Sequence, residues 1–181
     1  MAEEIRRVKR ELAYMGTVLK VYRDHMEFAN GNTALFDYIH HDGAAAVVPV
    51  MDDGTILMVR QFRNALDRYT LEIPAGKLDD PEEPGIVCAT RELEEETGYR
   101  SENLEWLITL RTTVALCNEK IEIFVAKNLI PSKQNLDEDE YIDVKAYTID
   151  ELKEKIYSGE IEDSKTVSAI LAYDTKYNKS K

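Results

Sequence analysis

GKLDDPEEPGIVCATRELEEETGY, residues 76–99, is the stretch of this 181-residue chain that decides the fold. Its second half predicts a helix from about Pro84 to Thr97, because proline suits the first helical turn and Gly98 suits the position after the last one. The run YTLEIPA at 69–75 predicts a strand just before it. We therefore expect a strand, a loop and a helix in succession.

Three glutamates of the predicted helix, Glu92, Glu95 and Glu96, project to one helical face because they lie three or four residues apart. Like charges this close oppose helix formation, so a fold that keeps them is expected to use their charge. Mg²⁺ prefers carboxylate oxygens and commonly bridges a protein carboxylate to a substrate phosphate. A solvated helix face is the alternative for a glutamate run alone, and the flanking arginine and glycines favour the metal site.

The same stretch resembles the Nudix box, G-x5-E-x7-R-E-U-x-E-E-x-G-U, where U is an aliphatic residue. The matching residues are Gly76, Arg91, Glu92, Leu93, Glu95, Glu96 and Gly98. Counting back from Arg91 gives Glu83, which leaves six residues after Gly76 where the box has five. Glu82, with a shifted helix start, is the alternative, and Glu83 is favoured because it keeps the helical register. Tyr99 takes the last aliphatic position.

The resemblance implies a magnesium-dependent pyrophosphohydrolase, with Mn²⁺ as the alternative ion. It implies metal ligation by Glu92, Glu95, Glu96 and the carbonyl of Ala75. It also implies supporting roles for Gly76, Glu83, Arg91 and Gly98, with Arg91 and Glu83 tying the loop to the helix by an ion pair.

An acidic run, Leu136–Glu140, is expected to be a loop before a short strand. Taken alone it suits a solvated surface loop. The ADP-ribose pyrophosphatase branch of the family carries a glutamate here that acts as general base or orients the water, and Glu138 aligns with it best, followed by Glu140. Glu95 is a further catalytic candidate.

The segments Arg60–Arg63 and Leu71–Gly76 also resemble that branch, and the likeness extends from about Met15 to Tyr173. It implies that Arg60, Arg63 and Glu72 contact substrate, the arginines through charge-assisted hydrogen bonds to phosphate. Surface ion pairing, including a pair between Arg63 and Glu72, is the alternative.

One departure concerns the substrate. ADP-ribose enzymes carry a Ser-Pro-Gly turn before a glutamate, and here Val114 replaces the proline while Glu119, a substrate-binding candidate, is kept. Because proline fixes φ, its loss is expected to reshape the pocket near the terminal ribose. ADP-ribose remains the first expectation.

Composition narrows the class of partner. The net charge of −12 argues against nucleic acid or an anionic membrane as the main partner, and no apolar run is long enough to span a membrane. Cys88 and Cys117 lack CxxC spacing and indicate reduced core residues of a cytoplasmic protein. The charged start, MAEEIRRVKREL, has no apolar segment typical of a signal peptide.

The order of elements predicts an α+β fold. Paired strands are expected from Tyr14 to His40, with a hairpin turn at Asn30–Gly31. Further strands are expected at 44–50, 55–62, 69–75, 104–110, 120–129 and 141–148, and helices at 149–160 and 163–177. A boundary near His41–Ala44 divides the chain into an N-terminal strand block, 1–42, and a domain at 43–181.

The resemblance implies a Nudix α/β/α sandwich at 43–181 and a strand block that mediates a homodimer and contacts the substrate base. The expected reaction is hydrolysis of ADP-ribose to AMP and ribose 5-phosphate. The alternatives are another nucleoside diphosphosugar, such as GDP-mannose, a damaged nucleoside triphosphate, or a Nudix-fold sensor that binds ADP-ribose without cleaving it.

Overall fold

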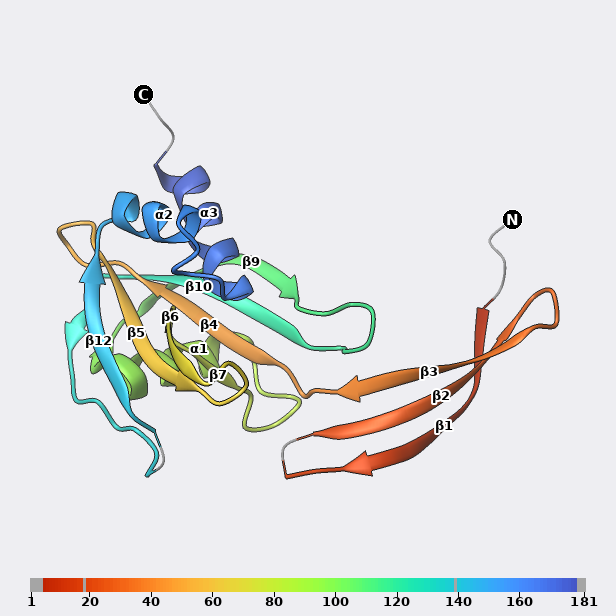
Figure 1. The fold of residues 1–181 in the computed structure, drawn as a ribbon. Helices are drawn as coiled ribbons and strands as arrows, with labels where there is room; N and C mark the ends of the chain where they lie inside the picture. The colour runs from red at the N-terminus through yellow and green to blue at the C-terminus, as the bar shows by residue number, and fades with distance from the viewer. Residues whose placement is uncertain (1–4, 18, 139, 179–181) are drawn as a thin grey trace. The chain divides into compact units, whose positions relative to one another are not determined.

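The computed structural model describes residues 5–17, 19–138 and 140–178 (Figure 1). The first strands are β1 (Ile5–Met15), β2 (Lys20–Phe28), β3 (Thr33–His40), β4 (Ala44–Pro49), β5 (Ile56–Arg63), β6 (Arg68–Glu72) and β7 (Ala75–Lys77). The later strands are β8 (Tyr99–Arg100), β9 (Asn103–Arg111), β10 (Lys120–Lys127), β11 (Ile130–Pro131) and β12 (Ile142–Tyr147). The helices are α1 (Gly85–Thr97), α2 (Ile149–Tyr157) and α3 (Ser164–Tyr177).

The chain forms two compact units. The first consists of the chain up to Asp42 together with the segment Arg111–Lys120. The boundary expected near residue 42 assigned that segment to the other part of the chain. The second comprises Gly43–Leu110 and the chain from Ile121 onward.

The second unit is built on the parallel pair β4 and β10, which lie at the centre of a sheet of order β7-β4-β10-β9. All six residues of β4 are buried, because both faces of the strand are covered. Alternate residues belong to different clusters: Ala46 and Val48 pack with α2 and α3, whereas Ala45 and Val47 pack with α1. The period-2 geometry of the strand thus serves two cores at once.

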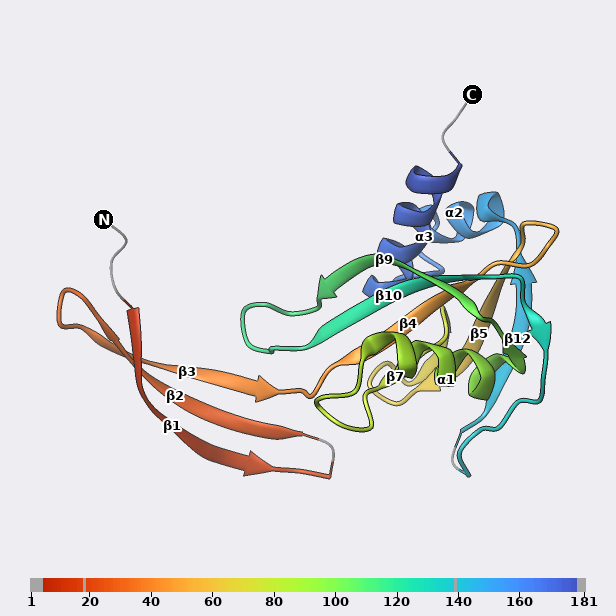
Figure 2. The ribbon, with the colours of Figure 1, turned by 180° about the vertical axis from the view of Figure 1, so that it is seen from behind.

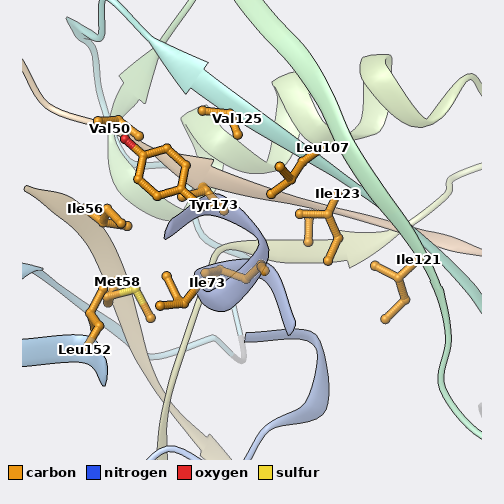
Figure 3. Packing of buried hydrophobic residues seen from close by; sticks show 14 of the residues in the cluster. Val50, Ile56, Met58, Ile73, Leu107, Ile121, Ile123, Val125, Leu152 and Tyr173 are labelled. Carbon is orange, nitrogen blue, oxygen red and sulfur yellow. The ribbon is translucent and has the colours of Figure 1, made fainter. Parts of the chain in front are cut away.

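Helix α1 covers one face of this sheet, and α2 and α3 cover the other (Figure 2). The larger core lies on the α2 and α3 side (Figure 3). The side chains labelled there are Val50, Ile56, Met58, Ile73, Leu107, Ile121, Ile123, Val125, Leu152 and Tyr173. A second sheet, β12-β5-β6, is antiparallel and contributes Ile56 and Met58 to this core. The predicted α+β fold with an α/β/α sandwich is confirmed.

The first unit holds the antiparallel sheet β1-β2-β3, whose hairpin turn contains Gly31 at φ 81°. Residues of the 111–120 segment run along β3: the Ile39 amide donates to the Leu116 carbonyl at 2.7 Å. The Asn118 side chain bonds both the amide and the carbonyl of His41, at 2.8 and 2.9 Å. These bonds fasten the segment to the sheet.

The expected start of the paired strands at Tyr14 was wrong, because β1 begins at Ile5. Charged side chains hide this strand from a hydrophobicity pattern. Cross-strand ion pairs stabilise it instead: Arg6 with Glu27 at 2.9 Å, and a two-pronged bond from Arg10 to Asp24 at 2.6 Å on each oxygen.

In the described part of the chain, no helix is both long enough and apolar enough to cross a membrane. Both cysteines are free thiols. Asp139 of the expected acidic loop lies outside the described residues.

Candidate active site

Helix α1 positions the glutamates by burying one stripe of its surface. Its buried residues are Gly85, Cys88, Ala89, Glu92, Leu93, Glu96 and Thr97, a three- and four-residue spacing that defines a single face. Two carboxylates therefore occupy positions that packing would ordinarily give to apolar side chains. Glu92 is 9% exposed and Glu96 is 3% exposed, whereas Glu95 lies beside the stripe and is half-buried.

The loop before the helix is shaped around these two carboxylates. A Cβ at Gly76 would lie only 2.0 Å from Oε1 of Glu92, so any larger residue there would displace the carboxylate from this position. The Ala75 amide donates to Oε2 of Glu96 at 3.0 Å. The strand β7 and the helix thus meet at Glu92 and Glu96.

Burial raises the pKa of Glu92 to about 7 and that of Glu96 to about 8. The charge of Glu92 raises the pKa of Glu96 further, and Glu95 adds to the effect on Glu92. A cation that displaced these protons would neutralise two buried carboxylates at once.

Arg91 is the basic side chain of this cluster. It donates to Glu92 at 2.6 Å, to Glu95 at 3.1 Å and to the carbonyl of Lys77 at 3.0 Å. It also lies 3.8 Å from Glu83, whose carboxylate accepts from the backbone of the loop at Asp79 at 2.8 Å. The structure therefore places Glu83 against Arg91, as the helical register predicted.

The donor set of this cluster suits a hard divalent cation, because it offers buried carboxylate oxygens whose negative charge is incompletely balanced. Among residues 5–17, 19–138 and 140–178, no three His, Cys, Asp or Glu side chains are arranged to hold an ion directly. Arg91 instead engages Glu92 and Glu95. Metal binding would require these carboxylates to exchange the guanidinium for the ion.

The two candidates for the general base differ in position. Burial is the main cause of the raised pKa of both Glu92 and Glu96. The charge of the half-buried Glu140 is close enough to raise both pKa values further. Its amide donates to the Asp137 carbonyl at 3.0 Å, which forms a local turn. Glu138 is exposed. Glu140 therefore acts electrostatically on the buried pair of α1, whereas the alignment of the sequence placed Glu138 first.

A second charged cluster lies behind the loop. Arg63 bonds both carboxylate oxygens of Glu72, at 2.7 and 2.6 Å, and the buried Lys165 donates to the same carboxylate. Burial alone would raise the pKa of Glu72, but the bonds from Arg63 and the charge of Lys165 outweigh it and lower the pKa to about 2. Arg63 and Glu72 thus pair with one another through Nε and Nη2 of the guanidinium.

Sequence reasoning missed the contribution of α3 to this cluster. Asp163 caps α3 by accepting from the Thr166 amide at 3.0 Å and also binds Lys165 at 3.0 Å. The Thr166 hydroxyl accepts from the Ile73 amide at 3.0 Å, so the start of α3 clamps the segment leading to Ala75. An aspartate three residues before a threonine at a helix start was the available signal.

The remaining two candidates have partners of their own. Arg60 lies 3.4 Å from Asp143 and stacks 3.8 Å from the ring centre of Tyr69. Glu119 belongs to the first unit, where it accepts from Thr112 at 2.5 Å and faces His41 at 3.4 Å.

Glu72→Gln should make the free energy of unfolding depend less on pH in the acidic range. The folded-state pKa lies below the ordinary value, so stability from Glu72 is complete above about pH 4.5 and is lost as pH falls toward 2. We expect the variant to be about 3 kcal/mol less stable at pH 7, and the gap to shrink by about 1 kcal/mol at pH 3.5. Urea unfolding at both pH values measures this. The exposed Glu102→Gln is the control, and a gap that does not change with pH would contradict the network.

Known proteins resemble this chain over most of its length. The NUDIX domain model matches residues 39–169. A methanol dehydrogenase activator from Bacillus methanolicus is 42% identical over 170 residues, covering 92% of this chain and 91% of that protein. An ADP-ribose pyrophosphatase from Bacillus subtilis (strain 168) is 38% identical over 169 residues, again covering 92% and 91%. The crystal structure of an ADP compounds hydrolase shares the fold, with a TM-score of 0.85 at 23% identity over 97% of this chain and 94% of that one. The chain belongs to the Nudix family.

Proposed function

We propose that the chain hydrolyses the pyrophosphate of a nucleoside diphosphate linked to a second group, with ADP-ribose as the preferred substrate and AMP and ribose 5-phosphate as products. The observation that carries this proposal is the pair of buried carboxylates, Glu92 and Glu96, held against the Ala75–Gly76 loop of a Nudix domain. The name of the relative from Bacillus subtilis supports the choice of ADP-ribose.

A divalent cation, Mg²⁺ first and Mn²⁺ second, would be held by Glu92, Glu95, Glu96 and the carbonyl of Ala75. When bound, such an ion neutralises charge on the pyrophosphate and polarises its phosphorus–oxygen bonds. Gly76 keeps space for the Glu92 carboxylate, and Arg91 and Glu83 hold the loop to the helix. Gly98 ends the helix at φ 71° just after Glu96.

The other side chains act on water and phosphate. Glu140 accepts the proton of the attacking water, with Glu138 and Glu95 as the other candidates for that role. Arg63, held rigid by Glu72, offers its remaining Nη1 donor to a substrate phosphate. Arg60 and Glu119 are further substrate contacts in this proposal.

A second copy of the chain would cover the strand block. Its sheet exposes large apolar side chains: Ile5, Val8, Leu12, Leu35 and Phe36 are 48–61% exposed. Exposed apolar side chains and open strand edges of this kind are commonly covered by association. The expected state is therefore a homodimer, and a monomer in sedimentation at micromolar concentration would contradict it. Two free thiols suit a reducing compartment such as the cytoplasm.

Two observations support alternative functions. Val114, where ADP-ribose enzymes carry proline, is 80% exposed, so its side chain is open to contact with another nucleoside diphosphosugar such as GDP-mannose. The relative with 42% identity carries the name of an enzyme activator, so stimulation of a methanol dehydrogenase is the second candidate function. The retained glutamates argue against a sensor that binds without cleaving.

A phosphate-release panel with Mg²⁺ and a coupled phosphatase tests the substrate. It compares ADP-ribose with GDP-mannose, UDP-glucose, diadenosine polyphosphates and 8-oxo-dGTP, and a parallel assay adds the chain to a methanol dehydrogenase. We expect ADP-ribose to give the highest kcat/KM. Preference for another diphosphosugar would assign the selection to the Val114 loop. Stimulation of the dehydrogenase without cleavage of any panel substrate would favour the second candidate.

Glu96→Gln should abolish most turnover while the fold survives. The glutamine keeps an acceptor for the Ala75 amide but removes a buried carboxyl whose ionised form is disfavoured by burial, so the melting temperature without metal is expected to stay level or rise. We expect kcat to fall at least about a hundredfold, and the increase in melting temperature caused by Mg²⁺ to shrink. Glu94→Gln, which makes the same charge change on the same helix, is the control. Turnover in Glu96→Gln close to that of the control would refute the metal assignment.

A further inference from the structure

The segment after β11 closes the C-terminal end of α1. The last carbonyls of a helix lack donors within the helix. Here the Ser132 amide donates to the Gly98 carbonyl at 2.7 Å and the Asn135 amide donates to the Glu95 carbonyl at 2.9 Å. The Glu96 carbonyl is bonded differently: its donor is the side-chain amide of Gln134, at 2.7 Å.

The same nitrogen of Gln134 has a second acceptor, the carbonyl of Ile142, at 3.4 Å. Both partners are carbonyl oxygens, so the amide must present its nitrogen to them. Ile142 is the first residue of β12, and Glu140 lies two residues before it. One side chain therefore links the backbone of Glu96 to the backbone next to Glu140.

We infer that Gln134 is a positioning residue for hydrolysis, which sets the place of Glu140 relative to Glu92 and Glu96 by tying the end of α1 to the start of β12. This inference rests on the proposed function. Close packing supports it: a Cβ at Gly98 would lie 3.1 Å from the backbone nitrogen of Gln134. Gly98 therefore serves both the left-handed helix end and the approach of this segment.

A capping role alone would give a different result. If Gln134 only satisfied the carbonyl of Glu96, its loss would lower the melting temperature and leave kcat unchanged. If it positions Glu140, kcat must fall while metal binding persists, because the glutamates of α1 remain on an intact helix. KM must also change little, since Gln134 contacts no phosphate-binding side chain proposed above.

Gln134→Ala removes both hydrogen bonds. Gln134→Glu keeps the size and shape of the side chain but replaces the donor with an acceptor, so it separates loss of the bonds from loss of packing. Asn135→Ala is the matched control, because its bond to Glu95 is made by the backbone and its side chain is exposed. Three quantities are measured: kcat and KM for ADP-ribose, the rise in melting temperature with Mg²⁺, and amide hydrogen exchange.

For both Gln134 variants we expect kcat to fall about tenfold or more, KM to stay within about threefold, and the Mg²⁺ effect to match wild type. Amides in the peptide that contains Glu140 and Ile142 should exchange faster, and those in the middle of α1 should not. A kcat equal to that of Asn135→Ala would overturn the inference.

Failure of the proposed function is distinguishable from failure of this inference. A wild-type chain that cleaves no ADP-ribose would refute the proposed substrate, and hydrogen exchange would then decide the role of Gln134 alone. Unchanged exchange near Ile142 in both Gln134 variants would overturn the tether.

Discussion

Burying the carboxyl groups of Glu92 and Glu96 on the packed face of α1 is the constraint on which the rest of the site depends. Both side chains lie on the stripe that also carries the core residues Cys88 and Leu93. Moving carboxylates out of water is costly unless they gain partners of opposite charge or hydrogen bonds. The surrounding structure supplies two such partners, the Ala75 amide for Glu96 and the Arg91 guanidinium for Glu92. Glycine at 76 also lets the backbone approach the Glu92 carboxylate closely. The raised pKa of both groups shows that these partners do not fully offset burial.

The segments that complete the site are held by bonds from outside α1. The loop leading to Ala75 is fixed by Thr166 and by the pair of Glu72 with Lys165, both from the start of α3. Gln134 ties the C-terminal end of α1 to the backbone of Ile142, two residues after Glu140. The helix that carries the glutamates is itself clamped against β4 through Leu93. Each segment that reaches the site is therefore anchored within a few residues of it.

The sequence predicted those parts of the molecule that follow from local rules. The helix and its glycine end follow from proline, glycine and glutamate spacing, and the central strands follow from runs such as Ala44–Val50. Strand β1 could not be predicted in this way, because it is stabilised by ion pairs to residues of β2 that lie 14 and 21 positions further along the chain. Lys165 and Gln134 were missed for the same reason: their partners lie at Glu72, Glu96 and Ile142, and no local spacing records such contacts.

The choice between Glu138 and Glu140 shows why motif spacing alone does not fix a catalytic group. Alignment counts residues along a loop, and a two-residue difference in loop length changes which of these glutamates matches. Position in space depends instead on the nearest anchor, and Ile142 places Glu140 closer to a fixed point than Glu138. The surroundings of each of the other carboxylates likewise determine its protonation and its role. Glu72, between Arg63 and Lys165, is held ionised, so its charge serves the scaffold. Burial raises the pKa of Glu96 to about 8, so near neutral pH this group keeps a proton that an incoming cation would displace.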